Sequence, residues 1–150
     1  MSDYDEAQDW ATINLDYNDG LNGTEESIAG EYGQIAGTVT YEGLKDLKGS
    51  NETIYHRGWA TCTTTGTLSE YPIPNAECND QYPSDYFIKS TAATKSGDSG
   101  GPHYKKFTYG GEEFLAVIAP HYGSGSEAVG CAAHRIKKTH NITFDQSNPI

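Results

Sequence analysis

The stretch Ser96-Gly97-Asp98-Ser99-Gly100-Gly101-Pro102 decides how the rest of this sequence is interpreted. One serine stands between glycines, an aspartate precedes it, and a proline closes the segment. Glycines permit the positive φ angles of a tight turn and leave the space above the Ser99 hydroxyl open. In such a turn the backbone amides of Gly97 and Ser99 can converge on a developing oxyanion. A turn rich in Gly, Ser and Asp on the protein surface is the ordinary alternative.

On both sides of this turn, short segments rich in Thr, Val, Ile or Tyr alternate with Gly, Asn, Pro or Asp. Regular spacing of such segments is typical of a β-sandwich or barrel. The expected strands cover residues 35–41, 52–60, 65–69, 85–90, 102–108, 113–120 and 130–136. The sequence therefore predicts an all-β fold, in which residues 34–136 form one antiparallel β-barrel and Ser99 lies in the turn before a strand.

Little in the sequence indicates a helix. No long amphipathic pattern is present, and a short helical turn over residues 137–141 is the one candidate. Residues 72–75, Pro-Ile-Pro-Asn, are interpreted as an exposed loop. Residues 1–9 are acidic and are expected to be irregular.

The composition excludes several classes of partner. The chain of 150 residues carries 21 Asp and Glu against 10 Lys and Arg, a net charge of -11, which disfavours nucleic-acid binding. No apolar run approaches the ~20 residues of a membrane-spanning helix, so no membrane partner is expected. The start of the sequence has no apolar leader pattern, but sequons at Asn22, Asn51 and Asn141 favour a secreted, extracellular protein.

Three cysteines are present, Cys62, Cys78 and Cys131, so at least one lacks a partner within the sequence. A disulfide between Cys62 and Cys78 is the preferred pairing because both flank one expected hairpin. The sequence has neither a CxxC motif nor a His-Cys cluster, and no metal site is expected.

The hexapeptide Gly-Asp-Ser-Gly-Gly-Pro at residues 97–102 resembles the nucleophile loop of the chymotrypsin-like serine proteases. Two further segments share the resemblance, which covers residues 9–136. Asp9 and the short alternating segment after it are similar to the family's catalytic-aspartate strand. Residues 57–67 are similar to the Gly- and Thr-rich hairpin that opens the second barrel in bacterial-type members. The resemblance implies a peptide-bond hydrolase without a cofactor.

The resemblance also implies roles and domains. Ser99 would be the nucleophile, Asp9 would orient the general base, and the amides of Gly97 and Ser99 would form the oxyanion hole. Residues 1–33 would hold the end of the first barrel and the linker between barrels. Residues 34–150 would form the second barrel, with the nucleophile loop.

The general base is missing from the expected place. The family's chain order is His, Asp, Ser, whereas all five histidines of this sequence follow Asp9. We therefore expect the histidine on an upstream barrel of the same protein, a partner that the chain needs for activity. The alternative is an inactive protease homologue that lost its histidine and acts as a binding module.

Specificity for a polypeptide substrate is predicted from three positions. In the glutamyl-endopeptidase branch of the family, a histidine at the place of His121 and a hydroxyl residue at that of Thr94 help bind an acidic side chain. Ser124 is a third possible donor. The acid that a trypsin-like pocket would require near Ala93 is absent. A strand histidine without a substrate role is the alternative for His121.

Asp98 is expected to be buried beside the nucleophile, where an unpaired carboxylate is costly. Arg57 or a protonated His56 is the expected counter-ion within this sequence.

Overall fold

Strands account for most of the regular structure, as the alternating pattern predicts. The computed structural model describes residues 3–5, 10–12, 28, 31, 33–73, 87–124 and 127–135. The elements in chain order are β1 (Asp3–Asp5), β2 (Trp10–Thr12), β3 (Gln34–Thr38), α1 (Tyr41–Ser50), β4 (Ile54–Gly58), β5 (Cys62–Gly66), β6 (Leu68–Glu70), β7 (Phe87–Ser90), β8 (Pro102–Tyr109), β9 (Glu112–Ser124) and β10 (Ala128–Cys131).

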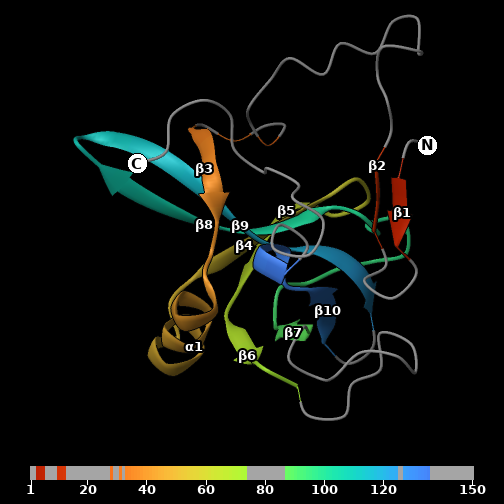
Figure 1. Cartoon of the computed structure of the whole chain (residues 1–150). Helices are drawn as coiled ribbons and strands as arrows, with labels where there is room; N and C mark the ends of the chain where they lie inside the picture. Colours follow the sequence, from red (N-terminus) through yellow and green to blue (C-terminus); the bar gives the residue numbers. More distant parts are fainter. Residues whose placement is uncertain are drawn as a thin grey trace, which may run out of the picture.

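Seven of these strands form a nearly closed barrel in the order β5-β4-β8-β9-β10-β7-β6 (Figure 1). Every neighbouring pair along this order is antiparallel. The predicted all-β, antiparallel barrel is therefore confirmed. One added strand departs from it, because β3 pairs with β9 in parallel.

The two ends of the sheet meet where β5 passes into β6. These two strands are the ends of the sheet order, yet only Thr67 separates them in the chain. Thr67 donates its amide to Thr91 Oγ1 at 2.8 Å and accepts the Thr91 amide at 3.0 Å. A Cβ on Gly66 would lie 2.2 Å from the Ala92 nitrogen, so only glycine permits this approach. The single strand predicted over residues 65–69 is thus two strands with a bend between them.

The main core lies on one face of the strands and under α1. Ile54 on β4 and Ile118 and Ala119 on β9 are buried there with Leu44 and Leu47 of the helix. Alternation along β4 places Ile54, His56 and Gly58 on this buried face and leaves the residues between them partly exposed. The same period-2 pattern predicted the strand from the sequence.

Helix α1 was not predicted, and it corrects the strand expected over residues 35–41. The extended segment ends at Thr38, and Thr40 caps the helix by accepting the Gly43 amide on Oγ1 at 3.1 Å. Leu44 and Leu47, three residues apart, bury one face of the helix. Within the part of the chain that the structure describes, no helix is long and apolar enough to span a bilayer.

Three smaller predictions are also wrong. β10 ends at Cys131 and residues 133–135 are helical, whereas a strand was predicted over 130–136. Ile73 is 7% exposed and packs with Phe87 and Cys131, so the predicted exposed loop is buried at this residue. Cys62 is a free, exposed cysteine and does not form the predicted disulfide. Cys78 and the helical turn predicted over 137–141 lie outside the described residues.

The N-terminal strands β1 and β2 pair with each other in a separate two-stranded antiparallel sheet. β2 confirms the strand predicted after Asp9, and β1 corrects the irregular structure predicted for residues 1–9. The division into domains at residues 33 and 34 stays a prediction.

Candidate functional site

Ser99 is exposed in a tight turn between β7 and β8, which confirms the predicted position of the serine before a strand. The Asp98 amide donates to the Lys95 carbonyl at 3.1 Å, and the Gly101 amide donates to the Asp98 carbonyl at 2.9 Å. Gly97 and Gly100 have φ angles of 100° and 84°, in the region that other residues rarely adopt. The turn therefore presents Ser99 to solvent on a backbone fixed by glycine geometry.

The buried side chain of Asp98 holds this turn in place. Its side chain is 1% exposed. It accepts hydrogen bonds from the amides of Ala60, Thr61 and Lys95 at 2.7, 3.1 and 2.8 Å, and from the Thr61 hydroxyl at 2.8 Å. Burial raises the pKa of Asp98, but these hydrogen bonds outweigh it and lower the pKa to about 2. The carboxylate is ionised and held by neutral donors.

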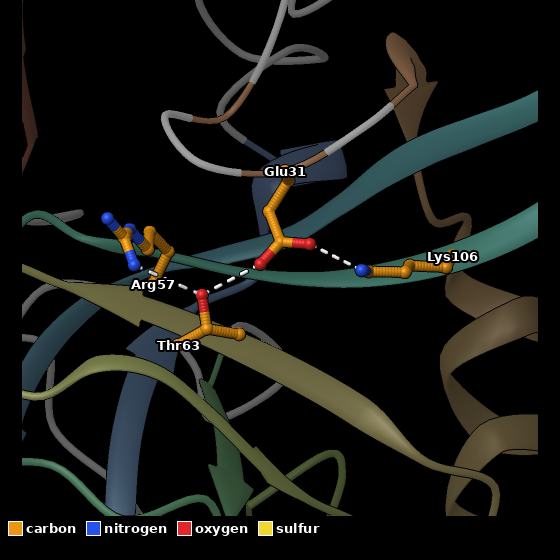
Figure 2. Close-up of polar contacts among 4 residues, drawn as sticks. All are labelled: Glu31, Arg57, Thr63 and Lys106. Carbon is orange, nitrogen blue, oxygen red and sulfur yellow. Dashed lines mark hydrogen bonds and ion pairs between the residues drawn. The ribbon is translucent and has the colours of Figure 1, made fainter.

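The predicted counter-ions of Asp98 are therefore wrong. Arg57 instead donates from its guanidinium to Thr63 Oγ1 at 3.2 Å. As Figure 2 shows, Thr63 in turn donates to Glu31 Oε1 at 2.7 Å, and Glu31 forms an ion pair with Lys106. His56 is not a cation either, because burial lowers its pKa to about 4. These donors could not be predicted from the sequence. Every residue except proline has a backbone amide, and no residue type marks the ones that point toward Asp98.

The loop is also bonded to β9. The Gly100 amide donates to the His121 carbonyl at 2.8 Å, and the His121 amide donates to the Gly101 carbonyl at 2.8 Å. A Cβ on Gly101 would lie 2.4 Å from the Arg57 carbonyl oxygen, so the loop also packs tightly on the end of β4. These contacts bring the Ser99 loop and His121, which the sequence predicted as parts of one site, next to each other.

The amides of Gly97 and Ser99 take no part in the backbone hydrogen bonds that hold the loop. The backbone hydrogen bonds of the turn use the amides of Asp98, Gly100 and Gly101. The amides of Gly97 and Ser99, the predicted oxyanion donors, have no backbone acceptor among the described residues. Stabilisation of an oxyanion would require backbone amides of this kind, without a backbone acceptor and next to the hydroxyl.

Behind the loop, His56, His103 and His121 form a buried cluster that the sequence did not predict. They come from β4, β8 and β9, which are neighbours in the barrel (Figure 1). His56 lies opposite His103 in the β4–β8 register, and His103 lies opposite Ala119, two residues before His121 on the same face. Their exposed fractions are 0%, 0% and 3%.

The three rings contact one another directly. The ring centroids are 4.6 Å apart for His56 and His103, 5.2 Å for His56 and His121, and 5.5 Å for His103 and His121. His103 Nε2 lies 3.4 Å from His121 Nδ1, a distance at which one neutral ring donates to the other. Both nitrogens of His56 and Nδ1 of His103 have no hydrogen-bond partner among the described residues.

All three imidazoles are neutral at neutral pH. Burial lowers the pKa of His56 to about 4 and that of His103 to about 3, and it also lowers the pKa of His121. The charge of Asp98 acts in the opposite direction on His56 and His121 without reversing the shift. Among the described residues, this cluster is the one group of three or more possible metal ligands close enough to share an ion.

The remaining predicted residues have separate outcomes. Thr94 lies in the segment between β7 and β8 and is half-buried. Ser124 ends β9, but its side chain lies outside the described part of the chain, as does Asp9. His134 lies away from the cluster, where its Nε2 is 3.4 Å from the Tyr71 hydroxyl.

A scan against protein-family models finds no matching family, and a search of curated proteins finds no match.

Proposed function

We propose that this chain is the C-terminal part of a secreted serine endopeptidase of the chymotrypsin type, with Ser99 as its nucleophile. One observation carries the proposal. An exposed serine stands on a glycine-shaped turn, and its own amide and that of Gly97 have no backbone acceptor in the described chain. A purely structural turn has no need of this combination.

The proposed reaction proceeds through an acyl-enzyme. Ser99 Oγ attacks the carbonyl carbon of the scissile peptide and loses its proton to a histidine base. The amides of Gly97 and Ser99 stabilise the oxyanion of the tetrahedral intermediate. Collapse of this intermediate breaks the C–N bond, and the base delivers its proton to the departing amine. Water, activated by the same base, then hydrolyses the ester and restores the serine.

The base is proposed to come from an upstream barrel of the same protein, with Asp9 orienting it. His56, His103 and His121 are poor candidates because their rings are buried whereas Ser99 is exposed. Removing one triad member leaves only residual catalysis. The chain without its upstream barrel should therefore show no turnover that depends on Ser99.

We further propose that the substrate carries Glu or Asp before the scissile bond. The backbone of His121 is bonded to the Ser99 loop and its side chain is 3% exposed, so a substrate carboxylate would meet this ring at the bottom of the proposed pocket. A neutral imidazole can still donate one N–H to a carboxylate, and Thr94 and Ser124 add hydroxyl donors. The net charge of -11 would slow the approach of an acidic substrate, an effect that salt screens.

The decisive experiment uses the chain produced with the reading frame that precedes it. A fluorophosphonate probe should label Ser99, located by peptide mass spectrometry, and the protein should cleave peptide substrates. Ser99→Ala should abolish both, whereas Ser96→Ala, an exposed serine of the same loop, should leave both intact. Peptide binding without labelling or cleavage would favour the inactive binding module instead.

Substrate preference is tested on the same longer protein by comparing kcat/KM for peptides with Glu, Gln, Phe or Lys before the scissile bond. Glu should be preferred, and His121→Ala should reduce this preference more than it reduces hydrolysis of the Phe peptide. Equal values for Glu and Phe would refute the acidic preference and leave the endopeptidase proposal in place.

A further inference from the structure

We infer that His56, His103 and His121 form a binding site inside the barrel for one Zn²⁺ ion or a similar transition-metal ion. The three side chains come from three adjacent strands and face one another. Each offers one ligand nitrogen, and these nitrogens lie within 4.8 Å of one another. The inference concerns metal binding alone and does not depend on the proposed hydrolysis.

The spacing of the rings is close to that of a zinc site. Zn–N bonds of about 2.0–2.1 Å place two nitrogens of a tetrahedral site about 3.4 Å apart. His103 Nε2 and His121 Nδ1 are already 3.4 Å apart. The ligand nitrogen of His56 is no more than 4.8 Å from the other two, so a small rotation of this ring would bring it to the same spacing.

A second observation points to a ligand. His56 is fully buried, and within the described part of the chain neither of its ring nitrogens has a hydrogen-bond partner. Leaving a buried polar atom without a partner costs about 1–3 kcal/mol, and most such atoms in proteins are paired with protein or with ordered water. A metal ion held with His103 and His121 would supply the missing partner of one His56 nitrogen. The cluster is therefore better explained as a site than as core packing.

The chemistry of the donors selects the ion. A neutral imidazole is the form that binds metals, and all three rings are neutral at neutral pH. Nitrogen donors suit Zn²⁺, Cu²⁺ and Ni²⁺, whereas Ca²⁺ and Mg²⁺ require oxygen ligands. The negative charge of Asp98 favours positive charge at His56 and His121, and it would offset part of the charge of the ion. Three histidines leave a fourth position for water or another ligand.

The test uses the chain stripped of metal with a chelator and then titrated with ZnCl₂ by calorimetry at pH 7.5. We expect one equivalent of Zn²⁺ to bind and the Tm to rise with Zn²⁺ concentration. MgCl₂ and CaCl₂ at the same concentrations should change neither.

Long-range ¹H–¹⁵N spectra of the histidine rings in the wild-type chain identify the ligands without any variant. The nitrogen signals of His56, His103 and His121 should shift on adding Zn²⁺, and those of His134 should not. His56→Gln should weaken Zn²⁺ binding by at least ~10-fold, the lower limit for loss of a supporting group at a metal site. His134→Gln and Cys62→Ser are the matched controls and should bind normally.

Failure of the wild-type chain to bind Zn²⁺, or ring signals that shift only at other histidines, would overturn the inference. The cluster would then be three neutral rings in tilted and edge-on contact, with a hydrogen bond between His103 and His121. If His56→Gln fails to fold, the wild-type spectra still decide between these outcomes.

Discussion

The hydroxyl of Thr61 donates a hydrogen bond to Asp98 Oδ2 at 2.8 Å, and this contact joins the β4–β5 turn to the loop that carries Ser99. The amide of the same threonine donates to the other carboxylate oxygen at 3.1 Å. The position of the serine is thus set by a carboxylate 37 residues away from its partner in sequence rather than by the loop alone.

Asp98→Asn should destabilise the protein by about 1.5–3 kcal/mol, the usual contribution of hydrogen bonds to a charged group. An amide NH₂ cannot accept the donors that now surround the carboxylate. Urea unfolding at pH 7 measures the loss, and Asp46→Asn, on the exposed face of α1, is the matched control and should be neutral. Because the pKa of Asp98 falls from 3.8 to about 2 on folding, its contribution is present above pH 3.8 and lost between pH 3.8 and 2. Equal stability of the two variants would show that the four hydrogen bonds contribute nothing.

Mild acid should destabilise the barrel in the absence of metal. The pKa values of His56 and His103 fall from 6.5 to about 4 and about 3 on folding, so the unfolded chain binds more protons below pH 6.5. The free energy of unfolding should decrease as the pH falls from 6.5 toward 4, by up to about 1.4 kcal/mol per pH unit for each histidine. Urea titrations across this range measure the slope, and His56→Gln should reduce it. If His56→Gln leaves the slope unchanged, protonation of His56 does not contribute to the loss of stability in acid.

Two glycine-to-alanine substitutions should have opposite signs. A Cβ on Gly58 would lie 2.1 Å from Asp98 Oδ1, so Gly58→Ala should displace the anchor and cost about 1–3 kcal/mol, as overpacking does. A Cβ on Gly49 in α1 would meet nothing within 4 Å, and Gly49→Ala should stabilise by roughly 0.5–1 kcal/mol. Chemical denaturation of both variants gives the two values. A neutral Gly58→Ala would mean that Asp98 can move without loss.

The coupling free energy between Glu31 and Lys106 should be larger than that of an ordinary ion pair on the surface. The Glu31 side chain is 7% exposed and also accepts the Thr63 hydroxyl, so water screens the pair poorly (Figure 2). A double-mutant cycle with Glu31→Gln and Lys106→Met should give a coupling above about 1 kcal/mol, beyond the range of exposed pairs. The exposed pair Glu42 and Lys45 is the control and should give roughly 0–0.5 kcal/mol. Similar couplings in the two cycles would refute the difference.

Local patterns predicted the strands well because each depends on residues next to one another. β4, β8 and β9 follow alternation and β-branched content, and all three lie within about four residues of the predicted bounds. Helix α1 escaped detection because Gly43 and Gly49 weaken its propensity and only Leu44 and Leu47 mark its buried face. The Thr40 cap and the left-handed Asn51 at its end were the signals available in the sequence.

In the candidate site, too, the features set by neighbouring residues could be predicted, and those set by residues far apart in the sequence could not. The Ser99 turn could be predicted because its glycines are contiguous. The cluster of His56, His103 and His121 could not, since it depends on the register of three strands and a one-residue slip would turn a histidine to the opposite face. The partner of Asp98 was mispredicted for a related reason: charge can be counted in a sequence, but the direction of a backbone N–H cannot.

The single residue between β5 and β6 has a consequence for association between molecules. The first and last strands of the sheet order are continuous through Thr67, so their outer edges meet at one bend, which restricts the access of a strand of another copy, the usual route to aggregates. That protection depends on one bend, where Gly66 lies against Ala92. Opening the bend would release two strand edges together and turn the barrel into a curved ribbon able to pair at both sides. Self-assembly of a damaged molecule would therefore begin at this seam, where Gly66 lies opposite Ile54 on the strand that also holds His56.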